Sequence, residues 1–160
     1  RFDEGDVRGM GRNAGGVRGI KLGDDDAVVG CDIVVVGETL LVASERGYGK
    51  RTEVAEYRRT GRGGKGILTM NVTERTGPVV GVRLVSEDQD VMLITDGGKV
   101  IRTPVRDISL IGRNTQGVRL IDLAEGEKVV SIARVADSGD DDAVEPGEPA
   151  GEEVTATDEE

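Results

Sequence analysis

The stretch Gly112-Arg113-Asn114-Thr115-Gln116-Gly117 is the third copy of a loop that recurs along the chain. The earlier copies are Gly11-Arg12-Asn13-Ala14-Gly15-Gly16 and Gly61-Arg62-Gly63-Gly64-Lys65-Gly66. Successive copies start 50 and 51 residues apart, and an arginine lies ten residues upstream of each, at Arg1, Arg51 and Arg102. A fixed period of about 50 residues is typical of propellers and other repeat arrays.

Between the loops, short apolar segments alternate with glycine-rich and aspartate-rich turns, which is the pattern of strands and hairpins. The segments that predict strands are 17–22, 27–36, 39–44, 49–54, 66–72, 79–85, 91–95, 99–104, 118–123 and 129–135. No segment has the period of an amphipathic helix. We therefore predict an all-β fold, a propeller-like array of four-stranded blades. Repeats that start near 1, 51 and 102 amount to about three blades, fewer than the roughly 4–8 that close a propeller, so we expect further blades upstream.

The net charge of −10 is unevenly distributed along the 160 residues. Residues 137–160 contain eleven acids and no Lys or Arg, whereas residues 1–136 contain 20 acids and 21 bases. We therefore divide the chain into a partial repeat domain, 1–136, and an acidic tail, 137–160, that we expect to be disordered. The tail is either a solubilising extension or an electrostatic competitor that occupies basic loops of the domain.

Several classes of chemistry are excluded by composition. The sequence has no His and a single cysteine, Cys31, which leaves no His-based catalytic triad, no zinc site and no disulfide within the chain. No stretch approaches the roughly 18 apolar residues of a membrane helix. We expect no cofactor or metal in this chain, no membrane contact and a cytoplasmic location.

The candidate binding residues are bases in and beside the repeated loops. They are Arg8, Arg12, Arg58, Arg59, Arg62, Lys65 and Arg113, together with Arg119 on the predicted strand after the third loop. Arg and Lys neutralise backbone phosphates, and interleaved glycines allow the backbone to approach them. Aromatic residues are too few to stack single strands, which favours duplex DNA. The alternatives are a solvated loop for these bases, an ion pair or a DNA contact for the Arg1, Arg51 and Arg102 set, and a rim or neighbouring-blade position for Arg18 and Arg119.

These repeats make residues 1–135 similar to the C-terminal domain of the DNA gyrase A protein. The resemblance is carried by residues 1–13, 94–103, 111–121 and 127–130. It implies a β-pinwheel that wraps duplex DNA around its rim, of which this chain holds about the last three blades and the tail. The pinwheel of the topoisomerase IV A protein is also similar. The basic-glycine box of the first blade, which would separate the two, lies outside this chain, although residues 57–66 resemble a degenerate copy of it.

The resemblance also implies a role in a larger enzyme. The whole type II topoisomerase would introduce negative supercoils at the expense of ATP, with the gyrase B protein and a second copy of gyrase A as partners and with ATP and Mg²⁺ bound by other domains. Its location would be the bacterial nucleoid. Tyr48 and Tyr57 do not match the family's catalytic motif, so we assign no catalytic residue. The rival interpretation is a propeller-type protein-interaction scaffold, which would present an apolar or central recognition face instead of a basic rim.

Overall fold

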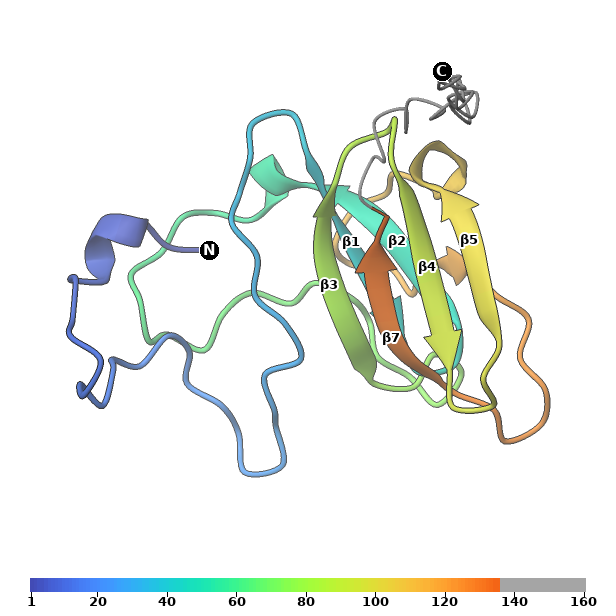
Figure 1. The fold of residues 1–160 in the computed structure, drawn as a ribbon, viewed down its shortest axis with the longest axis horizontal. Helices are drawn as coiled ribbons and strands as arrows, with labels where there is room; N and C mark the ends of the chain where they lie inside the picture. Colours follow the sequence, from blue (N-terminus) through green and yellow to red (C-terminus); the bar gives the residue numbers. More distant parts are fainter. Residues whose placement is uncertain (136–160) are drawn as a thin grey trace, which may run out of the picture.

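The computed structural model describes residues 1–135, and the predicted acidic tail, 137–160, lies outside the described residues. Two antiparallel sheets dominate it, one with the strand order β3-β1-β2-β6 and the other with the order β5-β4-β7 (Figure 1). The remaining regular elements within residues 1–135 are three one-turn 3-10 helices, so the all-β prediction is confirmed. The strands are β1 (Thr39–Ser44), β2 (Tyr48–Glu53), β3 (Val79–Val85), β4 (Asp90–Thr95), β5 (Val100–Pro104), β6 (Val118–Arg119) and β7 (Val129–Arg134), and the 3-10 helices are η1 (Glu4–Asp6), η2 (Val54–Glu56) and η3 (Val105–Asp107).

The repeat in the sequence is also a repeat in the backbone. The 3-10 helices lie at equivalent positions, and η2 and η3 each follow the second strand of a hairpin. The closing glycines of the three loops, Gly16, Gly66 and Gly117, have φ values of 77°, 83° and 77°. Glycine adopts this conformation without the steric cost that other residues carry. At Gly117 an added Cβ would also lie 2.5 Å from the carbonyl oxygen of Gly49, so the third loop is packed directly on β2.

The main hydrophobic core lies between the two sheets. Leu41 and Val85 of the first sheet pack with Leu93 and Ile132 of the second, and all four are almost completely buried. Alternate residues of a strand point to opposite faces, so Val42 of β1 enters a smaller cluster with Tyr48 and Met70 on the other side of the first sheet. Because both of its faces are covered, β1 is apolar almost throughout.

Three of the predicted strands are wrong. Residues 17–22, 27–36 and 66–72 form no strand, and the prediction for 118–123 shortens to the two residues of β6. The valine-rich run that ends at Val36 is exposed, with Val36 fully accessible and Ile33 at 78%. Within the first copy of the repeat, the strands therefore begin only with the β1–β2 hairpin.

The missing strands lack partners. β3 pairs with β1, about 40 residues earlier, and β6 pairs with β2, about 70 residues earlier. By the period of the repeat, 27–36 corresponds to β3, whereas 17–22 and 66–72 correspond to β6, and none of the three pairs with a strand among the described residues. A strand needs a neighbour to satisfy its backbone N–H and C=O groups, and apolar periodicity alone does not supply one.

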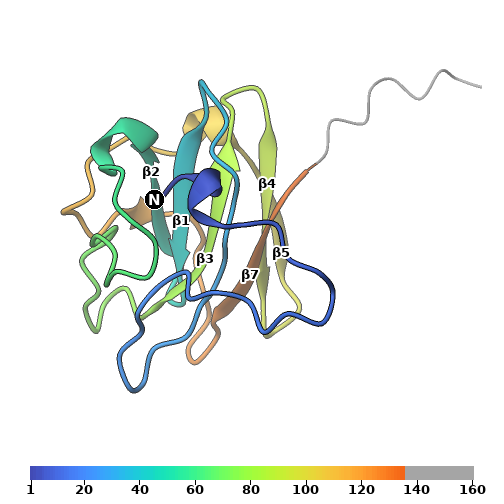
Figure 2. The same ribbon diagram turned by 90° about the vertical axis from the view of Figure 1, so that its left-hand side faces the viewer.

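The segments without strands lie together. Apart from η1, residues 1–38 and 57–72 run as loops on one side of the two sheets, and in the turned view they lie in front of both sheets (Figures 1 and 2). Backbone hydrogen bonds join these segments: Gly63 N–H donates to the Gly19 carbonyl at 2.8 Å, and Thr60 N–H donates to the Arg1 carbonyl at 3.0 Å. The second copy of the repeated loop therefore lies beside residues 18–21, which follow the first copy.

Candidate nucleic-acid interface

The loops beside the first sheet carry most of the excess positive charge. Residues 1–22 and 57–66, which we call the basic lobe, contain nine Lys or Arg and three Asp or Glu. The rest of residues 1–136 contains 12 bases and 17 acids. The near-neutral balance of the domain therefore conceals a separation of charge, with the positive part on two adjacent segments.

Four of the predicted binding residues are free in the basic lobe. Arg8, Arg12, Arg58 and Lys65 are exposed, and none donates a side-chain hydrogen bond or forms an ion pair within residues 1–135. A fifth, Arg59, forms an ion pair with Asp3. Solvent-exposed cations without carboxylate partners are available to neutralise phosphates.

The arginines of the second and third loops make the same contact with the preceding copy. Arg62 donates from Nη1 to the Arg18 carbonyl at 2.7 Å, and Arg113 donates from Nη1 to the Leu68 carbonyl at 2.9 Å. Arg18 and Leu68 occupy equivalent positions, seven residues after the start of their own loops. In the second and third loops, the repeated arginine therefore links its copy to the preceding one by a hydrogen bond. The sequence pattern did not reveal this role.

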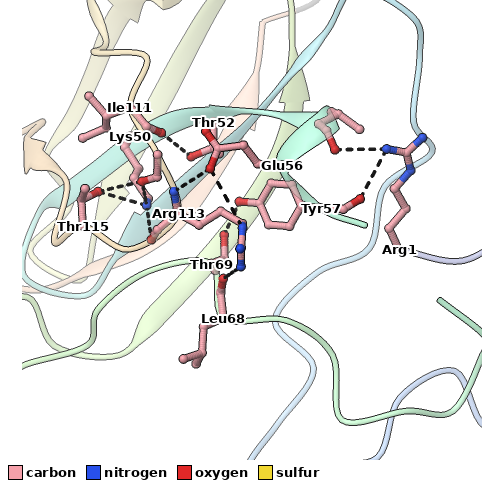
Figure 3. A network of polar contacts seen from close by, with 12 residues as sticks. Arg1, Lys50, Thr52, Glu56, Tyr57, Leu68, Thr69, Ile111, Arg113 and Thr115 are labelled. Carbon is pink, nitrogen blue, oxygen red and sulfur yellow. Dashed lines mark hydrogen bonds and ion pairs between the residues drawn. The ribbon is translucent and has the colours of Figure 1, made fainter. Parts of the chain in front are cut away.

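Arg113 is the most constrained of the predicted residues (Figure 3). Its backbone N–H donates to Glu56 at 3.1 Å, and its guanidinium lies 5.8 Å from the centre of the Tyr57 ring. The Nε atom is buried without a hydrogen-bond partner, 4.0 Å from the Glu56 carboxylate. With 26% of its side chain exposed, Arg113 positions the loop more than it offers charge to solvent.

A buried lysine that no sequence pattern singled out holds the third loop (Figure 3). Lys50 of β2 is inaccessible to solvent, and its ammonium donates to the carbonyls of Gly112 and Arg113, both at 2.6 Å, and to Thr115 Oγ1 at 3.1 Å. All three N–H groups of the ammonium are therefore used. Burial lowers the pKa of Lys50 because the charged form loses hydration.

Two of the three arginines that lie ten residues upstream of a loop, Arg1 and Arg51, contact the next copy of the repeat. Arg51 is 3% exposed; it donates from Nε to the Ile108 carbonyl at 2.8 Å and pairs with Glu87 at 3.1 Å. Arg1 reaches the carbonyl of Tyr57, the residue equivalent to Ile108, at 3.5 Å. Arg102 is exposed and pairs with Asp90 at 2.5 Å. Of the two alternatives that the sequence left open, an ion pair is present for Arg51 and for Arg102.

The last predicted residue, Arg119, lies on β6, which forms one edge of the first sheet. Its side chain is 60% exposed and pairs with Asp122 at 2.7 Å. Its other terminal nitrogen, Nη2, lies 3.4 Å from the Tyr48 hydroxyl, where it meets Arg75, a base in the turn at 73–77 that we did not select from the sequence. Arg75 stands outside the repeated loops, so the loop pattern could not point to it.

Two other kinds of site are absent from the described part of the chain. Among residues 1–135, no group of three His, Cys, Asp or Glu side chains is arranged to hold a metal ion. No helix within this range is long and apolar enough to cross a membrane.

Comparison with known proteins gives the family. A family model described as "DNA gyrase C-terminal domain, beta-propeller" matches residues 1–34, 38–86 and 89–136. The chain belongs to this family. Among curated relatives of this DNA gyrase domain, the gyrase A protein of Klebsiella oxytoca is 49% identical over 160 residues, and that of Escherichia coli (strain K12) is 49% identical over 142 residues. These matches cover 98% and 89% of the chain but only 18% and 16% of the relatives, so the chain spans less than a fifth of their length.

Solved structures agree with the gyrase family and its fold. The structure described as a DNA gyrase A C-terminal domain matches with a TM-score of 0.78 and 31% identity, over 84% of this chain and 46% of that chain. The C-terminal domain of DNA topoisomerase IV matches with a TM-score of 0.77 and 26% identity, over 84% of this chain and 42% of that one. The predicted resemblance to the gyrase domain and the pinwheel class of fold are therefore confirmed.

Proposed function

We propose that this chain binds and bends duplex DNA as part of the C-terminal domain of a DNA gyrase A protein. The observation that carries the proposal is the positive charge of the basic lobe, whose two adjacent segments contain nine bases and only three acids. Arg8, Arg12, Arg58 and Lys65 are the first-choice phosphate contacts, because their cations are exposed and unpaired within residues 1–135. The other four predicted residues contribute positive charge and also form hydrogen bonds or ion pairs within the protein. They are Arg59, Arg62, Arg113 and Arg119.

Binding follows from electrostatics and from fixed loops. Each phosphate that a Lys or Arg neutralises releases condensed counterions, which gives affinity that depends on salt and little on sequence. The second and third copies of the repeated loop are held by the hydrogen bonds of Arg62, Arg113 and Lys50, so their positions are fixed before DNA binds. Bases on a rigid, stepped surface favour a duplex that bends to meet them, and flexible sequences would do so at the lowest cost.

In the whole protein, the bent duplex would be delivered to a type II topoisomerase core. The partners would be the gyrase B protein and a second copy of gyrase A, and ATP and Mg²⁺ would act through other domains. The outcome would be ATP-dependent negative supercoiling in the bacterial cytoplasm. The chain offers DNA binding to this reaction and no catalytic residue.

The test is a salt series of binding to a duplex of a few tens of base pairs. We expect the logarithm of the association constant to fall linearly with the logarithm of the salt concentration. The double variant Arg58→Gln/Lys65→Gln should make that slope shallower by about 2, because each neutralised phosphate contributes about 0.9.

The matched control is Arg102→Gln/Arg106→Gln. It removes the same net charge from exposed positions on β5 and η3, on the side of the sheets away from the basic lobe (Figure 1). The control should keep the slope of the wild type. A folded wild-type chain that binds no DNA at low salt would refute the proposal and favour the protein-interaction scaffold. Equal slopes for the two double variants would refute the choice of surface.

A further inference from the structure

Two arginines from distant parts of the sequence converge on one phenol. Tyr48, the first residue of β2, is 8% exposed, and its hydroxyl receives hydrogen bonds from Arg75 Nε at 2.9 Å and from Arg119 Nη2 at 3.4 Å. The guanidinium carbons lie 5.0 Å and 5.9 Å from the centre of the Tyr48 ring, within the range of cation–π attraction. The tyrosine therefore orients both cations toward the same place.

The positive charge at this place is only partly compensated. Arg119 pairs with Asp122, whose side chain is 84% exposed, and Arg75 pairs with no carboxylate in the described part of the chain. A neutral hydroxyl does not offset the repulsion of two cations that share it as an acceptor. The hydrogen bonds from Arg119 and then Arg75 lower the pKa of the Tyr48 phenol, as expected for an electropositive site.

At the equivalent position of the next hairpin, the positive charge is paired with a carboxylate. Lys99 stands 51 residues after Tyr48, and its ammonium pairs with the Glu127 carboxylate at 2.9 Å. Hydrogen bonds from Thr95, from the backbone N–H of Ala124 and from Lys99 lower the pKa of Glu127 to about 2. The second sheet therefore places an ionised carboxylate beside the cation, whereas the first sheet places two arginines around a phenol.

The geometry points to a phosphate seat in the first sheet: we propose that Arg75 and Arg119, oriented by Tyr48, take a backbone phosphate of duplex DNA. Arginine presents several N–H donors in a planar fork that matches phosphate oxygens, and each guanidinium here keeps donors that the tyrosine does not use. The seat lies at β6, an edge of its sheet, and residues 66–75 lead to it from the basic lobe. It rests on the proposed function, since it adds one contact to the same duplex.

The test uses the full 160-residue chain and the salt series with three variants. Arg75→Gln and Arg119→Gln should each weaken binding at low salt by roughly tenfold, as expected for a hydrogen bond to a charged group. Because the two arginines share one phosphate, each single replacement should make the slope shallower by up to about 0.9. Tyr48→Phe keeps the ring and both charges but loses the shared acceptor, so affinity should fall while the slope stays nearly unchanged. The split between affinity and slope identifies Tyr48 as a positioning residue.

Controls separate the possible failures. Arg106→Gln removes an exposed cation elsewhere and should leave both affinity and slope unchanged. Arg75→Lys preserves the charge without the forked donors of the guanidinium, so it should keep the wild-type slope but only part of the affinity. This variant provides the test if Arg75→Gln lowers the midpoint of thermal unfolding.

Wild-type slopes in Arg75→Gln and Arg119→Gln would overturn the seat and leave the proposed function intact. A wild-type chain that shows no salt-dependent DNA binding would overturn both the phosphate seat and the proposed function. If inorganic phosphate at constant ionic strength binds the wild type and not Arg75→Gln, while DNA binding is equal in the two, the seat takes a free anion and the inference about the duplex is wrong.

Discussion

Replacement of Lys50 by alanine is expected to lower the free energy of unfolding by about 3–5 kcal/mol. The substitution removes the ammonium that donates to the carbonyls of Gly112 and Arg113, and it leaves a cavity under the third loop. An acceptor that loses its partner away from water costs about 1–3 kcal/mol, and truncation of a long buried side chain adds a packing loss. Urea denaturation measures the change.

Two further variants isolate the cause of that loss. Lys50→Met keeps most of the buried volume but not the donors, so it should recover only the packing part. Lys65→Ala removes an exposed lysine of the basic lobe and should change stability by less than about 0.5 kcal/mol. Wild-type stability in Lys50→Ala would contradict the role of this ammonium in holding the loop.

Replacement of Arg51 by alanine is the second large effect, a loss of about 2–3 kcal/mol. Arg51 joins β2 to the segment that follows η3 through the Ile108 carbonyl, and its side chain is 4% exposed. Glu87, its ion-pair partner, is 72% exposed and stays hydrated when Arg51 is removed, so most of the loss comes from the unpaired carbonyl and from packing. Thermal and urea unfolding measure the effect.

The repeat provides the control for this prediction. Arg102 has the same position in the next copy, but its side chain is 65% exposed and its contact is an ion pair with Asp90. Exposed ion pairs contribute about 0–1 kcal/mol, so Arg102→Ala should cost much less than Arg51→Ala. Equal losses of unfolding free energy in Arg51→Ala and Arg102→Ala would show that the buried contact of Arg51 with the next copy adds no stability.

The period of the loops carries most of the fold that the sequence could predict. Hairpins with both strands inside the chain, β1–β2 and β4–β5, form close to their predicted bounds. The run 27–36 has the same apolar character as β3 but forms no strand, and it pairs with no other segment of the described sheets. Strand propensity is local, whereas a strand in a sheet is a property of two segments.

The candidate site was predictable in its charge and unpredictable in its detail. Loop bases such as Arg58 and Lys65 are exposed, as a binding loop requires, but Arg62 and Arg113 use hydrogen bonds on the preceding copy. Lys50 follows no loop pattern, since the equivalent residue in the next hairpin is Ile101. Contacts between residues some 60 positions apart depend on how copies pack, and a single sequence does not display that.

The basic lobe is expected to bend duplex DNA as it binds. The direct measurement is energy transfer between dyes at the two ends of a duplex of a few tens of base pairs, compared at equal occupancy for the wild type and for the variant with Arg8, Arg12, Arg58 and Lys65 changed to Gln. We expect transfer to rise when the wild type binds, and to rise much less with the variant, because fewer phosphates are neutralised on the protein side. A wild-type complex that saturates without a change in transfer, or a variant that bends the duplex equally, would contradict the account.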